Sequence, residues 1–93
     1  MAIKTGLHTV GVTPTPIPPT SLAGRNSISV YNSNLVGTVV YLGDLNVTAS
    51  GPGQGLPLVP GDRIQLALTA AAANKLYGIV GKGSAIVSCL EIS

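Results

Sequence analysis

The stretch "RNSISVYN", Arg25–Asn32, decides the fold that we expect for this chain. In it, the apolar residues Ile28 and Val30 alternate with serines and a tyrosine. Because successive side chains of a β-strand point to opposite faces, this alternation predicts a strand with one apolar face.

Further strands of the same kind follow along the chain. The segment "TVVYLG", residues 38–43, is rich in β-branched and aromatic residues, which favour strands. The segment "RIQLALT", residues 63–69, alternates so that Ile64, Leu66 and Leu68 share one face. Short strands separated by turn signals are typical of an all-β sandwich or barrel.

The rest of the C-terminal part adds two strands and few other elements. The segments 75–81 and 84–92 predict a β-hairpin across Lys82-Gly83, and residues 49–62, with four glycines and three prolines, predict a loop. The alanine run of residues 70–74 predicts at most one helical turn. The predicted fold class is therefore all-β: a small antiparallel β-sandwich, or jelly-roll-like barrel, of six to seven strands.

Residues 1–24 are predicted to form an extended N-terminal arm outside a sandwich domain of residues 25–93. The run "TPTPIPPT", residues 13–20, contains four prolines, and proline fixes φ and lacks the amide hydrogen, so we expect polyproline II structure. A segment extended in advance loses less entropy on docking, which suits contacts with neighbouring subunits. The residues expected to make these contacts are Ile3, Leu7, Val10, Pro14, Pro16, Ile17, Pro18 and Pro19. The imperfect alternation from Ala2 to Val12 also allows an edge strand.

The composition points to assembly. Charged residues make up 9% of the chain, against about 25% in an ordinary globular protein. Such a surface does little to keep copies apart in solution, so we expect a homo-oligomer or a larger assembly. The alternative is a surface that glycine, serine, threonine and asparagine make polar without charge.

Nucleic acid and membranes are not expected partners. The five basic residues are scattered, and the three aromatic residues are all tyrosines, whereas nucleic-acid binders concentrate basic residues and stacking aromatics. The chain has no apolar run of the ~20 residues that a membrane helix needs. The N-terminus lacks the apolar core of a secretory signal, so we expect synthesis in a cytoplasm.

Groups suited to catalysis are few: His8, Asp44, Asp62, Cys89 and Glu91. Cys89 lies in a predicted strand, where cysteine usually acts as a small buried hydrophobe, and His8 is expected at the surface. The segment "DLNVT" begins like a calcium loop but lacks the later glycine and glutamate, which predicts a turn held by Asp44. We therefore expect no catalytic, cofactor-binding or metal-binding residues, no cofactor and no enzymatic activity.

Four segments in order, "RNSISVYN", "VYLGDLNVT", "GLPLVPGDRIQL" and "KLYGIVGKGSAIVSCLE", resemble a small β domain of many tailed-bacteriophage virion proteins. Such domains often read R-x-S-I-x-V-x-N, V-Y-L-G, G-x-P-L-x-P-G, L-Y-x-I and V-x-x-L-E. The resemblance covers Arg25 to Glu91, and these two charges can pair if their strands are neighbours. The loop "ASGPGQG" and the alanine run depart from the pattern.

The resemblance implies a capsid decoration (cement) protein that binds the outside of the shell and stabilises it. Its partners would be the major capsid protein and further copies of itself, most simply as a homotrimer at a capsid threefold axis. It would be made in the host cytoplasm and lie on the virion surface. The alternative is a tail, fibre or head-fibre component whose loop "ASGPGQG" contacts a host glycan or protein. A small hydrolase or metal enzyme is disfavoured by the scarcity of catalytic groups.

Overall fold

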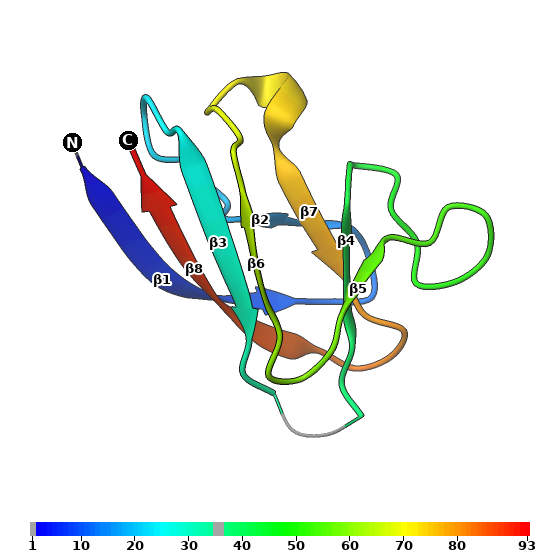
Figure 1. Cartoon of the computed structure of the whole chain (residues 1–93). Helices are drawn as coiled ribbons and strands as arrows, with labels where there is room; N and C mark the ends of the chain where they lie inside the picture. Colours follow the sequence, from blue (N-terminus) through cyan, green and yellow to red (C-terminus); the bar gives the residue numbers. More distant parts are fainter. Residues whose placement is uncertain (1, 35–36) are drawn as a thin grey trace.

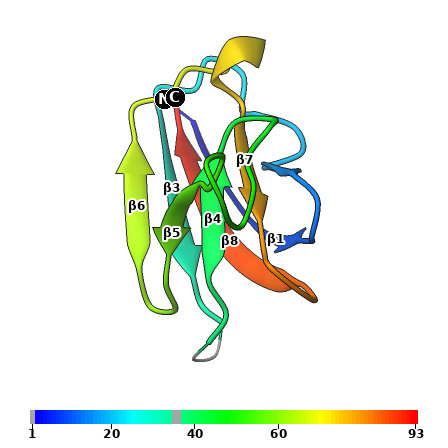
Figure 2. The same cartoon turned by 90° about the vertical axis from the view of Figure 1, so that its right-hand side faces the viewer.

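The protein is a sandwich of two antiparallel four-stranded sheets in a computed structural model that describes residues 2–34 and 37–93 (Figures 1 and 2). Sheet A has the strand order β1-β8-β3-β6 and sheet B the order β2-β7-β4-β5. The strands are β1 (Ile3–Val10), β2 (Thr15–Ile17), β3 (Ser27–Asn32), β4 (Val40–Gly43), β5 (Leu56–Leu58), β6 (Arg63–Leu66), β7 (Leu76–Ile79) and β8 (Ala85–Ile92). The predicted all-β antiparallel architecture is confirmed, but eight strands are described rather than six to seven, and the sheets do not close into a barrel.

Strand pairing is nested from the ends of the chain toward its middle. β1 pairs with β8, β2 with β7, β3 with β6 and β4 with β5. The β3–β8 and β4–β7 ladders then join these pairs into the two sheets. The predicted hairpin across Lys82-Gly83 is wrong, because residues 80–84 carry the chain from sheet B to sheet A. β7 and β8 each lie between two other strands of their own sheet, so neither has a free side for the other.

The predicted boundary after residue 24 does not separate two structural units. β1 pairs with β8 along its whole length, from Ile3↔Ile92 to Val10↔Ala85, and β2 pairs with β7. The alternative of an edge strand is therefore correct for Ile3–Val10. The proline run forms a short strand instead of an isolated polyproline arm. Proline is tolerated there because β2 lies at a sheet edge, where its missing N–H breaks no ladder.

The core lies between the two sheets and draws on the first 24 residues as well as the rest. Val10 and Ile17 are both 0% exposed. Gly78 makes room for this packing, since a Cβ there would lie 2.6 Å from Cδ1 of Ile17. The buried cluster comprises Val10, Ile17, Ile28, Val30, Val40, Leu42, Leu58, Leu76, Val80, Ala85, Val87 and Cys89.

Residues 56–74 follow two of the local predictions and depart from a third. Ile64, Leu66 and Leu68 pack together against the core, as the alternation predicts. The alanine run forms one short 3₁₀ turn, Ala72–Asn74, which confirms the limit of a single turn. The segment expected to be loop contains β5, a three-residue strand at the edge of sheet B.

Candidate functional site

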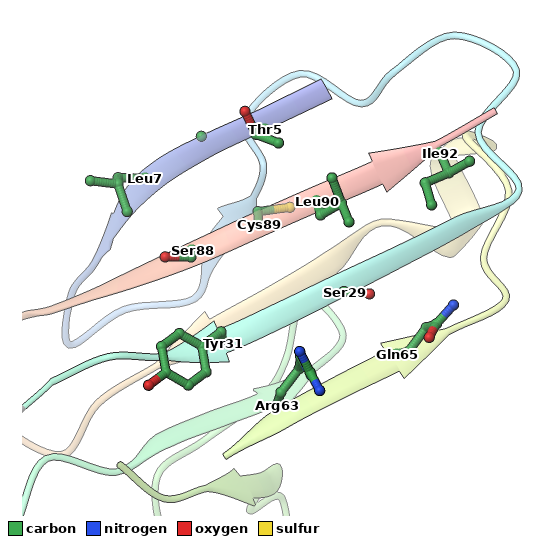
Figure 3. A pocket seen from close by; sticks show the side chains of 11 residues that line it. Thr5, Leu7, Ser29, Tyr31, Arg63, Gln65, Ser88, Cys89, Leu90 and Ile92 are labelled. Carbon is green, nitrogen blue, oxygen red and sulfur yellow. The ribbon is translucent and has the colours of Figure 1, made fainter. Parts of the chain in front are cut away.

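The outer face of sheet A, turned away from the core, is the candidate binding surface. It is hollowed into a shallow depression of about 930 Å³ that side chains of all four strands line (Figure 3). The register places them in rows across the sheet. One row runs Thr5, Leu90, Ser29 and Gln65, and the next runs Leu7, Ser88, Tyr31 and Arg63.

This face is divided into an apolar and a polar half. The apolar half follows β1 and β8. Its apolar residues, here called the apolar strip, are Ile3, Leu7, Ile86, Leu90 and Ile92, and Thr5 and Ser88 lie among them. Ile3 is 64% exposed, Leu7 69% and Ile86 47%. The polar half follows β3 and β6, where Figure 3 shows Tyr31 beside Arg63 and Ser29 near Gln65. Among the described residues that line the depression, Arg63 alone carries a charge.

The apolar strip has the chemistry of a protein-binding surface. Single exposed apolar side chains are ordinary on a soluble protein, but a contiguous group rimmed by polar residues marks an interaction site. Interface cores are depleted of charge and rimmed by polar side chains. The outer face of sheet A has both properties, with the strip beside the β1 edge and Arg63 at the opposite edge.

The structure buries some of the residues predicted to contact neighbouring subunits and leaves others at the surface. Val10, Ile17 and Pro18 are buried within this chain, so they are not available to a neighbour. Pro14 and Pro16 are half-buried and Pro19 is exposed. Of the eight, Ile3 and Leu7 lie together on the outer face of sheet A, because alternate residues of β1 share a face.

Arg25 and Glu91 form a buried ion pair beneath one end of the sandwich. Nη1 of Arg25 donates to Oε2 of Glu91 at 2.9 Å, and the two side chains are 0% and 1% exposed. The remaining Arg25 donors bond backbone carbonyls of Leu68, Thr69 and Asn74 at 3.0, 2.9 and 3.3 Å. The predicted pairing of Arg25 with Glu91 is confirmed, because the strand β3 that follows Arg25 lies beside β8.

Asn32 is a second buried polar anchor, which the sequence reasoning missed. Its amide donates to the carbonyls of Thr38 and Leu58 at 2.9 and 2.7 Å. Its side-chain oxygen accepts from the backbone N–H of Asn34 at 3.0 Å. The alternation of the strand could have revealed it, because Asn32 lies two residues after Val30 and therefore on the same inward face as Ile28 and Val30. These bonds make Asn32, like Arg25 and Glu91, a scaffold residue.

The loop of residues 44–55 projects from sheet B (Figure 1) but is anchored at its base. Oδ1 of Asp44 accepts the N–H of Asn46 at 2.9 Å, which confirms the predicted turn. Val47, 4% exposed, packs over Gly43 and Gly55, where a Cβ would lie 2.8 and 2.5 Å from its Cγ2. The loop presents Leu45, 61% exposed, to solvent.

The β1–β8 pairing brings His8 and Cys89 onto adjacent strands and the same inner face. Cys89 is 5% exposed and belongs to the core, as predicted. Burial, followed by the nearby Glu91 carboxylate, raises the pKa of the Cys89 thiol to about 11. A nucleophilic cysteine needs the opposite shift, so this pair lacks the electrostatics of a catalytic dyad. His8 is half-buried over Gly6 rather than fully exposed.

We expect Cys89 to be unreactive toward a thiol reagent in the folded protein. At pH 8 only about one thiol in a thousand is ionised when its pKa is about 11, against roughly a quarter for a free cysteine. Labelling with a chromogenic disulfide should therefore be at least about a hundredfold slower than in denaturant. The labelling rate should rise as pH approaches 11. Fast labelling of the folded chain at pH 8 would contradict the assignment of Cys89 to the core.

Residues 2–34 and 37–93 lack two features of other protein classes. No group of three or more histidine, cysteine, aspartate or glutamate side chains in these ranges is placed to hold a metal ion. No helix described there has the length and apolar character needed to cross a membrane. No family model, curated protein or solved structure matches the chain.

Proposed function

We propose that this chain is a structural virion protein that binds the outside of a bacteriophage capsid as a decoration protein and stabilises the shell. Its partners are the major capsid protein and other copies of itself, and its place is the capsid surface. The observation that carries the proposal is the apolar strip on the outer face of sheet A, a surface suited to a protein partner.

The strand order supports a virion scaffold. Nested pairing from β1–β8 inward to β4–β5 is the order of a jelly roll wound from one long hairpin. Double-sheet jelly rolls occur in viral capsid domains, and also in lectins and cupins. Because one fold serves many functions, this order supports the proposal by analogy alone.

The motif residues add support of a different kind. Arg25 and Asn32 are the first and last residues of the first matching segment, and Glu91 is the last residue of the final one. All three are buried and hydrogen-bonded. The resemblance to phage virion domains thus includes residues that hold the sandwich together. The surface that meets the capsid is expected to vary between such proteins, and here we place it on the apolar strip.

The proposal is tested by adding the protein to purified phage heads that lack it. We expect binding at hundreds of copies per head, counted against the major capsid protein. A Leu90→Lys variant should bind at least tenfold more weakly, because a charge placed at the centre of a desolvated interface is costly. Binding is measured by cosedimentation with the heads over a range of protein concentrations.

Leu45→Lys is the matched control, since it makes the same chemical change at an exposed leucine on the loop of residues 44–55. It should bind heads like the unchanged protein. Equal binding by Leu90→Lys would show that the apolar strip does not face the capsid. Absence of binding to heads by the unchanged protein would contradict the decoration function itself.

The second candidate function is that of a tail, fibre or head-fibre component. It is favoured by the projecting loop and its exposed Leu45, which would then contact a host glycan or protein. Copy number separates the two functions. About a dozen copies that travel with purified tails, and binding lost through Leu45→Lys, would favour the fibre role.

A further inference from the structure

The four edge strands of the sandwich are not equally protected against pairing with another chain. Edges are commonly blunted by short length, proline or charge. β2 and β5 have three residues each and contain Pro16 and Pro57. β6 has four residues and begins with Arg63. β1 is eight residues long, contains no proline, and has Lys4 as its one lysine, arginine or acidic residue.

The free edge of β1 presents backbone groups from every second residue. The N–H of Ser93 donates to the carbonyl of Ala2 at 2.9 Å. Ala2 and Ser93 are therefore a hydrogen-bonded pair, and the same register continues through Ile3↔Ile92. Hydrogen-bonded and non-hydrogen-bonded pairs alternate in an antiparallel ladder. The even residues of β1 therefore bond to β8. The odd residues, from Ile3 to Thr9, direct their N–H and C=O groups away from the sheet.

The side chains of these odd residues are self-complementary. If a second β1 is placed antiparallel with Thr5 on a two-fold axis, Ile3 lies opposite Leu7 of the other copy and Thr5 opposite Thr5. Apolar pairs and threonine pairs directly across an antiparallel ladder are both stabilising. Ile3 and Leu7 are the most exposed large apolar residues of the described chain, at 64% and 69%.

Charge does not oppose this arrangement. The ammonium of Lys4 points to the inner side of β1, where it donates to the carbonyl of Thr20 at 2.7 Å. Arg63 lies on β6, at the far edge of sheet A. Like charges directly opposite one another would destabilise the pairing, and in this register Lys4 lies opposite Gly6.

We infer that two copies of this chain pair through β1 to form a two-fold dimer with a continuous eight-stranded sheet. The apolar strips of the two copies then meet at the seam, which places the least polar part of each outer face at the centre of the joined surface. Such an interface is isologous, with the same surface used by both partners. This dimer is independent of the capsid function and replaces a threefold contact as the primary self-association.

The test is the mass in solution of the full chain and of three variants at position 5. The unchanged chain should sediment at twice its 9.3 kDa at high concentration and dissociate on dilution. Thr5→Pro should weaken the dimer at least tenfold. This substitution removes both hydrogen bonds of the central Thr5–Thr5 pair of the dimer. It leaves the β1–β8 ladder intact, because the N–H of Thr5 does not bond to β8. Circular dichroism checks that this variant keeps its fold.

Charge substitutions at the same position test the register. Thr5→Lys and Thr5→Glu should each weaken the dimer about fivefold, since like charges meet on the two-fold axis. An equal mixture of the two should recover a mixed dimer. Gln65→Lys, the same charge change on the opposite edge strand, is the matched control and should dimerise normally.

Hydrogen exchange gives a second readout. The amides of Thr5 and Leu7 should become protected as concentration rises, while those of Lys4 and Gly6, which bond to β8, are protected throughout. A monomer at all concentrations, a trimer, or a dimer unaffected by Thr5→Pro and by both charge variants would overturn the inference.

Discussion

Replacing Glu91 with alanine should lower the free energy of unfolding by about 3–5 kcal/mol, because it leaves the Arg25 guanidinium buried and without its counter-charge. The two side chains are 0% and 1% exposed, so the guanidinium is not in contact with bulk water. Stability of a domain of this size is about 5–15 kcal/mol in total. The variant should therefore be marginally folded. Urea unfolding followed by circular dichroism measures the loss.

The paired replacement Arg25→Met with Glu91→Leu should remain destabilised. In many proteins an apolar substitute for a buried ion pair is neutral or stabilising. Here the guanidinium also satisfies the carbonyls of Leu68, Thr69 and Asn74, and Oε2 of Glu91 accepts the N–H of Leu22 at 3.0 Å. Each backbone group left unsatisfied costs about 1–3 kcal/mol.

The control for the ion-pair variants is Lys82→Met, which removes an exposed cation and should change stability by less than about 0.5 kcal/mol. A double variant as stable as the unchanged protein would show that the hydrogen bonds to the connecting segments contribute little. The ion pair would then be replaceable by packing alone.

Removing residues 1–24 should abolish folding rather than release a domain. The deletion takes away β1 and β2, uncovers the central strands β8 and β7, and removes Val10 and Ile17 from the core. Loss of one buried isoleucine to alanine costs about 2–5 kcal/mol, which is comparable with the total stability of such a domain. The truncated chain should give the circular dichroism of an unfolded or aggregated protein.

Two single variants calibrate this result. Ile17→Ala should lose about 2–5 kcal/mol, whereas Val12→Ala, at a side chain 54% exposed, should change stability by less than about 0.5 kcal/mol. A soluble chain of residues 25–93 with sharp unfolding and the strand spectrum of the full protein would contradict the placement of β1 and β2 in the sandwich.

Local patterns were sufficient for several parts of the fold. The alternation in β3 and β6 predicts both strands and their inward faces, because the two-residue period of a strand is a local property. The single turn in the alanine run follows from residue type and length in the same way, and the usual behaviour of a strand cysteine favours the burial of Cys89. The sequence predicted that Arg25 pairs with Glu91 if their strands are neighbours, but it did not show that the strands are neighbours.

The first 24 residues show where local patterns fail. Four prolines in eight residues indicate an extended backbone correctly, but not whether that backbone joins a sheet. Its edge position makes the difference, and an edge is defined by strands distant in sequence. Likewise, Val10 and Ile17 were expected to contact neighbouring subunits, whereas the pairing of their strands with β8 and β7 buries them in the core of this chain.

The sequence by itself thus determined the all-β class, most strand positions and the low charge of the surface. Each of these depends on residue type or on neighbours within a few positions. Only the tertiary structure decided the nested order of the strands, the place of β1 and β2 in the sandwich, and the apolar strip. These depend on which strands lie side by side, and pairings across as many as 89 positions, as in Ile3↔Ile92, leave no local pattern.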